Sequence, residues 1–456
     1  MSVEAAPRRS WAHSPWFWVV AVIIALIVVL AAISIGNWLW LDAHPVTIVD
    51  PTPAPLPILT RPIAGGPNQA LLERGRYLTV AGDCVSCHTR KGGQPFEGGL
   101  GLSTPFGVIY SPNITGEKTT GLGNWTPEQF YRALHEGIAA DGHHLYPAFP
   151  YPHFTNVTPD DAKAILAFLK TVPGQPYTPP PNRLPFPLNI RAMLIGWNLL
   201  FFHSHDFAPD PSQSAEWNRG SYLVNGLEHC GACHTPTNAL GAEESNEAFQ
   251  GGKLGNWFSP DLTGNNKTGL ANWSLDELVQ YLKTGRNAHS NAGGVMAEVV
   301  AYSTSQLSDA DLHAIATYIK STPASPGKSP PAPDSQAMQT GGKIYADACA
   351  GCHLSRGQGQ PQIFPKLAGS AVAQQDDATT VLHLILAGGR TAPTPTRPSA
   401  ISMPSFAWKL TDQQVADVAT YVRNAWGNHA TPVTAKTVAD LRKSLKLDQP
   451  LGSPSL

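Results

Sequence analysis

A chain of 456 residues is too long for one ordinary domain, and at roughly 150 residues per domain it predicts about three. The formal net charge is -2 and only 14% of the residues are charged, which excludes the basic surface that nucleic-acid binding requires. Proline (42) and glycine (41) are abundant beside 42% apolar residues, a composition typical of compact domains with much loop and linker.

The N-terminal region predicts a membrane anchor. Residues 16–41 form a run of 26 without a charged side chain, which is long enough to cross a bilayer. Arg8 and Arg9 precede this run and Asp42 follows it, so the positive-inside rule places the N-terminus in the cytoplasm. A cleaved signal peptide is the alternative, but it has a shorter apolar core and a small-residue cleavage site. We therefore expect a cytoplasmic tail and a transmembrane helix over 1–43, followed by a linker over 44–67.

All six cysteines belong to three copies of the pattern C-x-x-C-H, which is the attachment signature of c-type haem. The two thiols form thioethers to the porphyrin, and the adjacent histidine becomes the proximal iron ligand. Zinc or disulfides explain a single cysteine pair, but not three pairs that are each completed by histidine. The sequence thus predicts three haem c groups, with covalent attachment at Cys84, Cys87, Cys230, Cys233, Cys349 and Cys352 and proximal ligation by His88, His234 and His353.

The three motifs head an internal repeat. "ERGRYLTVAGDCVSCHT" parallels "NRGSYLVNGLEHCGACHT", and "TGGKIYADACAGCH" keeps the same start. Each unit closes with an amphipathic helix whose expected N-cap is Thr158, Ser308 or Thr411. Proline-rich stretches separate the units. We expect an all-α fold in which an N-terminal transmembrane helix precedes three cytochrome c domains at 68–175, 212–322 and 335–430. Linkers at 176–211, which includes an interdomain helix, and at 323–334 join these domains. A tail at 431–456 follows the third domain.

The second and third units each contain a methionine where a distal iron ligand is expected. A thioether opposite histidine completes the coordination of many electron-transfer haems. Met296 follows His234 by 62 residues and Met403 follows His353 by 50, and both precede the closing helix of their unit. We therefore predict axial ligation by Met296 and Met403.

The first unit departs from this pattern. The residue 61 positions after His88 is Phe149, which cannot bind iron. We predict that His153 is the sixth ligand, with His143 or His144 as the alternatives and an open or water-bound iron as a third. Two histidine ligands give a lower potential than histidine with methionine, so we expect the first haem to have the lowest potential of the three.

The chain resembles the tri-haem cytochrome c subunits of bacterial membrane-bound, periplasm-facing dehydrogenases. The resemblance covers about 69–427 and is carried by the three motifs, the paired blocks "SPNITGEKTTGLGNW" and "SPDLTGNNKTGLANW", "LYPAFPY" and "SMPSF". It implies an electron-transfer subunit without a catalytic site of its own, which takes electrons from a catalytic dehydrogenase subunit and passes them to ubiquinone. It also implies a location in the inner membrane, with a single N-terminal span and the haem domains facing the periplasm.

The resemblance also bears on the identity of the partner. Many members that serve alcohol or sugar-acid dehydrogenases resemble "LYPAMPY", with methionine where this chain has Phe149. The version "YPAFPYPHFT" looks more like the partners of molybdenum hydroxylases, which favours a molybdenum-dependent aldehyde dehydrogenase with a separate iron–sulfur subunit. The alternatives are a quinoprotein (PQQ) alcohol dehydrogenase and a flavoprotein sugar or sugar-acid dehydrogenase. An autonomous haem peroxidase with an open first iron is the alternative from another class.

Overall fold

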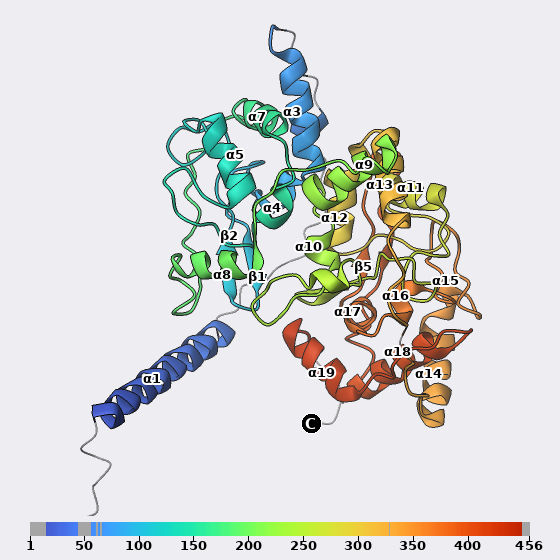
Figure 1. Cartoon of the computed structure of the whole chain (residues 1–456). Helices are drawn as coiled ribbons and strands as arrows, with labels where there is room; N and C mark the ends of the chain where they lie inside the picture. The colour runs from blue at the N-terminus through green and yellow to red at the C-terminus, as the bar shows by residue number, and fades with distance from the viewer. Residues whose placement is uncertain (1–14, 44–55, 61–62, 64–65, 328, 449–456) are drawn as a thin grey trace, which may run out of the picture.

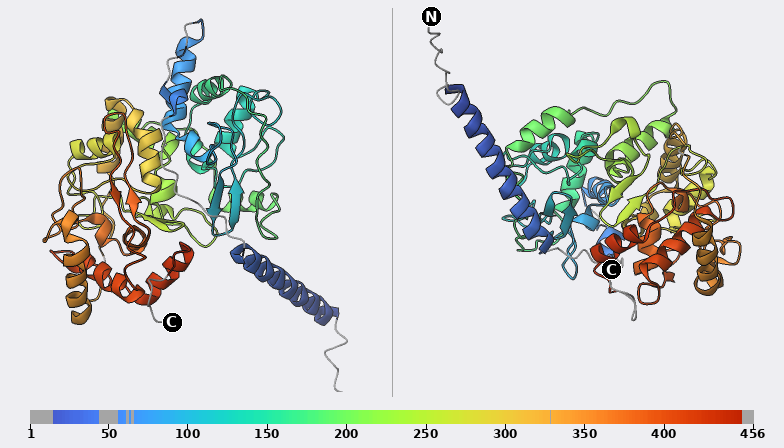
Figure 2. Two further views of the ribbon diagram at one scale, coloured as in Figure 1. Left: turned by 180° about the vertical axis from the view of Figure 1, so that it is seen from behind. Right: turned by 90° about the horizontal axis from the view of Figure 1, so that it is seen from below.

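The computed structural model describes residues 15–43, 56–60, 63, 66–327 and 329–448 of the chain. Three mainly helical units follow one another in space in the order of the sequence, and α1 (Pro15–Ala43) extends away from them (Figures 1 and 2). The predicted cytoplasmic tail before residue 15, residues 44–55 of the predicted linker and the chain after residue 448 lie outside the described residues.

The predicted transmembrane anchor is contradicted by the structure. A bilayer crossing requires about 20 consecutive apolar residues in one helix. Within the described part of the chain, no helix has both the length and the apolar character for that crossing. The predicted fold class therefore loses its transmembrane helix, and the predicted location, a single span in the inner membrane, loses its basis.

Each unit is built around two helices that cross, one at its start and one at its end. The side chains of Thr158, Ser308 and Thr411 each accept a hydrogen bond from the backbone N–H three residues later, so the predicted N-caps of the closing helices are confirmed. The crossing pairs are α3 (Gln69–Ala81) with α7 (Pro159–Leu169), α9 (Ala215–Tyr222) with α13 (Asp309–Lys320), and α14 (Ser335–Ala348) with α18 (Asp412–Asn424).

A glycine lets the two helices of each pair approach closely. A Cβ atom at Gly75, Gly220 or Gly341 would lie 1.9, 2.0 or 2.2 Å from a carbonyl oxygen of the partner helix. These distances are far below van der Waals contact, so backbone meets backbone at each crossing and a larger residue has no room. The same contact in three units shows that the repeat extends to the packing of its helices.

Short helices and hairpins fill each unit between its crossing helices. The first unit contains α2 (Pro57–Thr60), α4 (Cys84–Cys87), α5 (Pro127–Glu136) and α6 (Tyr151–Phe154), and α8 (Met193–Phe201) joins it to the second. The second contains the π-helical turn η2 (Leu223–Leu227), α10 (Gly231–His234), α11 (Leu275–Thr284), α12 (Val295–Tyr302) and the 3-10 turns η3 (Ser245–Glu247) and η4 (Thr304–Gln306). The third contains α15 (Ala350–His353), α16 (Ala371–Gln374) and α17 (Thr379–Ala387), and α19 (Ala435–Ser444) follows its closing helix.

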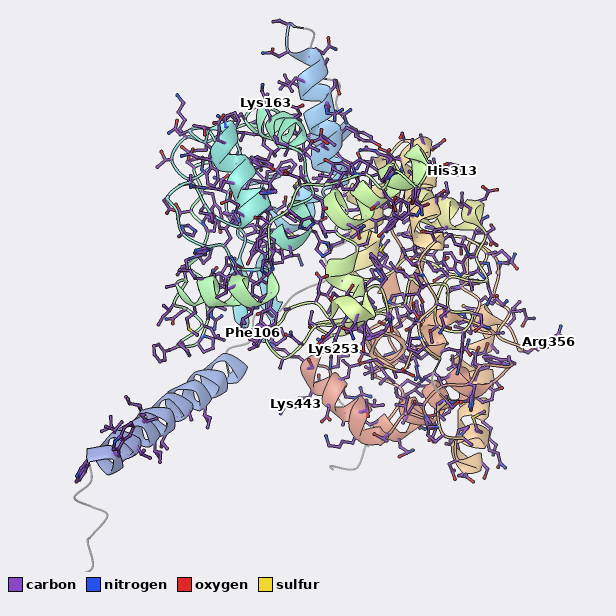
Figure 3. The ribbon with its side chains drawn as sticks, viewed as in Figure 1. Phe106, Lys163, Lys253, His313, Arg356 and Lys443 are labelled. Carbon is purple, nitrogen blue, oxygen red and sulfur yellow. The ribbon has the colours of Figure 1, made fainter. Side chains whose placement is uncertain are left out.

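Small antiparallel hairpins add strands to the predicted all-α fold. In the first hairpin Gly101 lies opposite Tyr110, and Figure 3 labels Phe106 at its turn. A Cβ atom on Gly241 of the second unit would lie 2.8 Å from the Phe106 ring, so the turn touches the neighbouring unit. The hairpins pair β1 (Gly101–Thr104) with β2 (Gly107–Tyr110), β3 (Gly252–Leu254) with β4 (Trp257–Ser259), and β5 (Gly389–Arg390) with β6 (Ser402–Met403).

The first two units share one hydrophobic core, and reciprocal hydrogen bonds join them. The Tyr222 hydroxyl of the second unit donates to Asp161 Oδ2 of the first over 2.6 Å. The Tyr77 hydroxyl of the first unit donates to Asp311 Oδ2 of the second, also over 2.6 Å. Each carboxylate also pairs with an arginine of its own unit. These two units therefore form one body with matched contacts on its two sides.

The third unit has its own core and packs on the second. The Thr380 hydroxyl on α17 donates to the carbonyl of Phe258 on β4 over 2.8 Å. Beyond this unit, α19 packs against α18, and Arg442 Nε donates to Asp412 Oδ1 over 2.7 Å in a buried ion pair. The segment expected as a C-terminal tail thus contains a docked helix.

The linker between the first two units is bound along part of its length. The backbone N–H of Arg183 donates to the carbonyl of Val108 on β2 over 2.8 Å, and the Val108 N–H donates back over 2.9 Å. The Tyr110 N–H donates to Asn182 Oδ1 over 2.9 Å. The proline-rich segment therefore extends the first hairpin and is not a free spacer.

Candidate functional site

Each C-x-x-C-H motif lies on a short helix, namely α4, α10 or α15. All six thiols are free. Burial raises the pKa of Cys84 and of Cys87 to about 12, and the Asp83 charge adds to this effect. These two thiols are therefore neutral, in surroundings that also suit an uncharged thioether.

The histidine of each motif is held by a proline carbonyl of its own unit. Because a carbonyl oxygen only accepts hydrogen bonds, Nδ1 carries the proton in each ring and Nε2 keeps its lone pair. Burial lowers the pKa of all three imidazoles, against the effect of these hydrogen bonds, so the neutral ligand form is favoured. The bonds run from Nδ1 of His88 to Pro112 (2.7 Å), of His234 to Pro260 (2.7 Å) and of His353 to Pro365 (3.0 Å).

These three prolines were not predicted, although their recurrence after each motif in the repeat could have indicated them. They recur in "SPN", "SPD" and "FPK", each downstream of its motif. In the first unit a glycine completes the arrangement, since the Gly98 N–H donates to the carbonyl of His88 over 2.8 Å. Gly98 has a φ of 78°, and a Cβ there would lie 2.5 Å from the Pro112 carbonyl, so another residue would displace the acceptor that orients His88.

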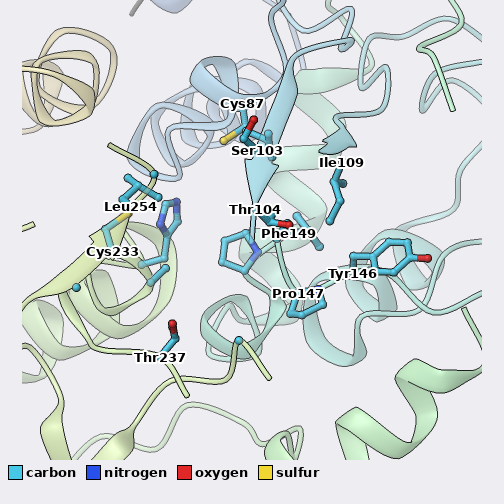
Figure 4. A pocket seen from close by; sticks show the side chains of 18 of the residues that line it. Cys87, Ser103, Thr104, Ile109, Tyr146, Pro147, Phe149, Cys233, Thr237 and Leu254 are labelled. Carbon is cyan, nitrogen blue, oxygen red and sulfur yellow. The ribbon is translucent and has the colours of Figure 1, made fainter. Parts of the chain in front are cut away.

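A cavity of about 2280 Å³ lies beside the first motif. Figure 4 shows Cys87, Ile109 and Phe149 around it and Cys233 of the second unit on its other side. The cavity is more than twice the roughly 1,000 Å³ that bounds most small-molecule pockets. A thiol pair, an imidazole with Nε2 available and largely apolar walls are what covalent haem requires, so the residues present fit the predicted group.

The wall of this cavity includes both Phe149 and His143. Asp141 Oδ1 lies 2.6 Å from Nδ1 of His143, so the other ring nitrogen, Nε2, is the one that can bind a metal. Of the three histidines considered as sixth ligand, His143 lines the cavity, whereas His144 and His153 do not belong to its wall. The Nδ1 atom of His144 is buried without a hydrogen-bond partner among the described residues.

His153 lies at the contact between the first two units. Its Nε2 is 2.7 Å from Glu243 Oε1, and its Nδ1 is 3.2 Å from the carbonyl oxygen of Asn225. Both ring nitrogens are thus engaged by the second unit. Ligation by His153 stays a prediction, and it requires that the ring nitrogen which binds the iron gives up its present partner.

The two methionines predicted as distal ligands are half-buried. Met296 is the second residue of α12 and packs against the core of the first two units. Met403 ends β6 and packs against the core of the third unit. Ligation by these two sulfurs stays a prediction.

The motifs of the first two units lie close together, and the third unit is joined to the second by aromatic stacking. Cys87 of the first motif and Cys233 of the second line the same cavity (Figure 4). Trp257 on β4 stacks on His383 of α17 with ring centroids 3.7 Å apart. Electron transfer between haems needs short separations, and both contacts bring neighbouring units together.

Two buried carboxyl groups lie beside the motifs and were not predicted. Asp83 accepts a hydrogen bond from the Ser86 hydroxyl over 2.6 Å, and Glu228 accepts one from Ser303 over 3.1 Å. Burial raises the pKa of Asp83 to about 7 and that of Glu228 well above its usual range. The charge of these two carboxyl groups therefore depends on pH. Because they lie close to the first two motifs, a change in this charge would alter the potential of a haem bound there.

Zinc was the rival interpretation of the cysteine pairs. Throughout the described residues, no group of three or more histidine, cysteine, aspartate or glutamate side chains is arranged to hold a metal ion.

Comparisons with known proteins agree with the repeat. A family model described as cytochrome c matches residues 72–173, 218–323 and 338–426. The gluconate 2-dehydrogenase cytochrome c subunit of Pantoea cypripedii is 42% identical over 82% of this chain and 90% of that protein. The cytochrome c subunit of the quinone alcohol dehydrogenase of Gluconobacter oxydans (strain 621H) is 42% identical over 82% of this chain and 83% of that protein. A nicotinate dehydrogenase subunit of Pseudomonas putida is 40% identical over 80% of this chain but 31% of its own length.

Proposed function

This chain belongs to the cytochrome c family, with haem c as its cofactor and one domain for each of three haems, and we propose that it carries electrons from a catalytic dehydrogenase to ubiquinone. The resemblance to cytochrome c subunits of dehydrogenases is confirmed. The chain is accordingly an electron-transfer subunit of a dehydrogenase complex and not its catalytic subunit.

The observation that carries the proposal is the threefold arrangement of a thiol pair beside an imidazole whose Nδ1 is bound to a proline carbonyl. Haem c supplies reversible one-electron storage at iron. The chain's residues hold it covalently, orient the proximal imidazole and exclude water with apolar walls. We assign covalent attachment to Cys84, Cys87, Cys230, Cys233, Cys349 and Cys352, proximal ligation to His88, His234 and His353, and distal ligation to Met296 and Met403.

For the first haem we assign a histidine as sixth ligand. His143 already lines the cavity. For His153, the ring nitrogen that binds the iron must first give up its partner, Glu243 or Asn225. Near-infrared magnetic circular dichroism of the ferric protein separates the cases: one bis-histidine and two histidine–methionine signatures are expected, and three histidine–methionine signatures would contradict the assignment.

As catalytic partner we propose a molybdenum-dependent aldehyde dehydrogenase with a separate iron–sulfur subunit. Phe149 supports it, because many members of this family that serve alcohol or sugar-acid dehydrogenases resemble "LYPAMPY" instead. The similarity to the nicotinate dehydrogenase of Pseudomonas putida supports a partner outside the alcohol and sugar group. Purification of the native complex tests the partner: molybdenum is expected in the companion polypeptides, whereas PQQ or flavin would replace the proposal by its alternatives.

Haem attachment is tested by the mass of the mature chain. Three haem adducts are expected, and the double substitution Cys349→Ser with Cys352→Ser is expected to leave two. A matched control is Ser355→Ala, just beyond the same motif, which should keep all three. A natural chain with fewer than three adducts would refute the attachment sites.

A further inference from the structure

Arg286, at the contact between the second and third units, carries a buried positive charge. It follows α11, and its Nη2 donates to the Thr391 hydroxyl of the third unit over 3.0 Å and to the carbonyl of Ser399 over 2.5 Å. The residue is 5% exposed, and its Nε atom is buried without a hydrogen-bond partner among the described residues. Because a buried charge is costly unless it is paired, this guanidinium calls for a further acceptor.

Two other buried arginines show how such a charge is satisfied elsewhere in the described chain. Arg423 donates from Nε, Nη1 and Nη2 to backbone carbonyls. Arg442 pairs with the Asp412 carboxylate and donates to two carbonyls from its other nitrogens. Throughout the residues that the structure describes, Arg286 forms no ion pair with a carboxylate. Arg286 therefore differs from the other two in lacking acceptors.

A second cation lies close to Arg286. The Nη2 of Arg397 donates to the side-chain oxygen of Gln362. The backbone N–H of Gln362 donates to the carbonyl of Asn287, the residue after Arg286, over 3.3 Å. Burial and the Arg397 charge both lower the pKa of the Arg286 guanidinium. Two guanidinium groups beside one glutamine, without a described carboxylate to pair with them, make a place that favours an anion.

This place lies where two segments of the third haem site meet. Gln362 lies between His353 and Pro365, whose carbonyl orients the proximal imidazole. Arg397 lies in the loop from β5 to β6, and β6 ends in Met403, the predicted distal ligand. The hydrogen bond between Arg397 and Gln362 thus joins the proximal segment to the distal segment. Because a porphyrin lies between its two axial ligands, its edge is expected where these segments come together.

We propose that Arg286 and Arg397 bind a propionate carboxylate of the third haem, an inference that rests on the haem attachment of the proposed function. A guanidinium matches a carboxylate with two parallel N–H donors, and Arg286 has unused donors for it. Ferrous haem is one charge more negative than ferric haem, so nearby cations favour the ferrous form. Arg286 of the second unit therefore raises the potential of a haem that the third unit attaches.

Spectroelectrochemical titration of the haem-loaded full chain tests this contact. Arg286→Gln removes one cation and should lower the potential of the third haem, and Arg397→Gln should do the same. Arg286→Lys keeps the charge without the two parallel donors and should restore part of the potential. Arg356→Gln is the matched control: Arg356 is exposed three residues beyond His353, at the outer edge of the molecule (Figure 3), and every potential should stay unchanged because solvent screens its charge.

Two further measurements identify the haem and the contact. In a chain with Cys349→Ser and Cys352→Ser, which lacks the third haem, Arg286→Gln should leave the two remaining potentials unchanged. A shift in either of them would assign Arg286 to another haem and overturn the proposal. With ¹³C in the haem carboxylates, the reduced-minus-oxidised infrared spectrum should contain a carboxylate band that moves in Arg286→Gln and stays in place in Arg356→Gln.

The results also separate a propionate from other occupants. Inorganic phosphate, added at constant ionic strength, should leave the third potential unchanged. A dependence on phosphate that disappears in Arg286→Gln would assign the site to a free anion and refute the propionate. If Arg286→Gln and Arg397→Gln keep the natural potentials, or the infrared band does not move, water alone covers the guanidinium and the contact is refuted.

The haem content of each chain distinguishes failure of this contact from failure of the attachment sites. Three adducts are expected by mass in the natural chain and in each arginine variant. Fewer than three in the natural chain would refute the attachment sites, whereas three adducts with unaltered potentials would refute only the contact with propionate. If Arg286→Gln loses an adduct, Arg286→Lys and Arg397→Gln carry the same comparison.

Discussion

Replacing Gly341 by alanine is expected to destabilise the third unit, whereas the same change at Gly342 is not. A Cβ at Gly341 would lie 2.2 Å from the carbonyl oxygen of Asp417 and 2.7 Å from Cβ of Tyr421. A Cβ at Gly342 would lie 3.1 Å from the Tyr421 ring, whose far end can shift. Alanine gains about 1 kcal/mol of helix propensity at either position. Overpacking against backbone costs about 3 kcal/mol, so the net loss for Gly341→Ala is about 2 kcal/mol.

Calorimetry of the haem-loaded full chain measures this difference. For a unit of this size, a change of 1 kcal/mol shifts the Tm by about 4–8 °C, so Gly341→Ala should lower the transition of the third unit by about 10 °C. Hydrogen exchange should locate the loss in α14 and α18. If Gly341→Ala unfolds at or above the temperature of Gly342→Ala, the close backbone contact does not set the helix crossing and the reasoning is refuted.

Three further substitutions test the contacts described above. Tyr222→Phe removes a donor to the buried Asp161 carboxylate, and we expect the free energy of unfolding of the first two units, measured in denaturant, to fall by about 1.5 kcal/mol. Asp83→Asn should flatten the pH dependence of the free energy of unfolding. Burial raises the pKa of Asp83 to about 7, so protonation of Asp83 stabilises the fold by up to about 4 kcal/mol at low pH. This stabilisation is lost as the pH rises from about 4 to about 7. Arg442→Ala removes the cation that faces buried Asp412 and should cost about 3 kcal/mol in thermal unfolding of the third unit.

Each of these substitutions has a control. Tyr77→Phe removes the reciprocal hydrogen bond and should cost as much as Tyr222→Phe; an effect at only one site would contradict the matched contacts. Asp309→Asn changes a carboxylate that is 80% exposed and should keep the natural pH profile; if Asp83→Asn keeps it too, Asp83 does not titrate as described. Lys436→Ala breaks an exposed ion pair and should change stability by about 0.5 kcal/mol or less; an equal effect of Arg442→Ala would contradict its role.

Local features of this protein were predictable from its sequence. A C-x-x-C-H segment brings two thiols and an imidazole together within one helical turn, whatever surrounds it. The three predicted haem c groups agree with the three cytochrome c domains that the family model matches. The N-caps at Thr158, Ser308 and Thr411 depend only on the next three residues, and they are confirmed. Hydropathy alone also predicted a transmembrane anchor, and there the described structure disagrees.

Contacts between distant residues were decided only by the tertiary structure. His153 was predicted to face the first haem, yet its partner Glu243 is 90 positions away, and no local pattern announces such a contact. The shared core of the first two units, the docking of α19 and the cavity along α8 likewise depend on how whole units pack. By itself, the sequence predicted which residues would carry the chemistry, because a C-x-x-C-H segment is local. The fold decided which side chains line the cavity beside the first motif and how the units pack, because burial and distance are properties of the packed chain.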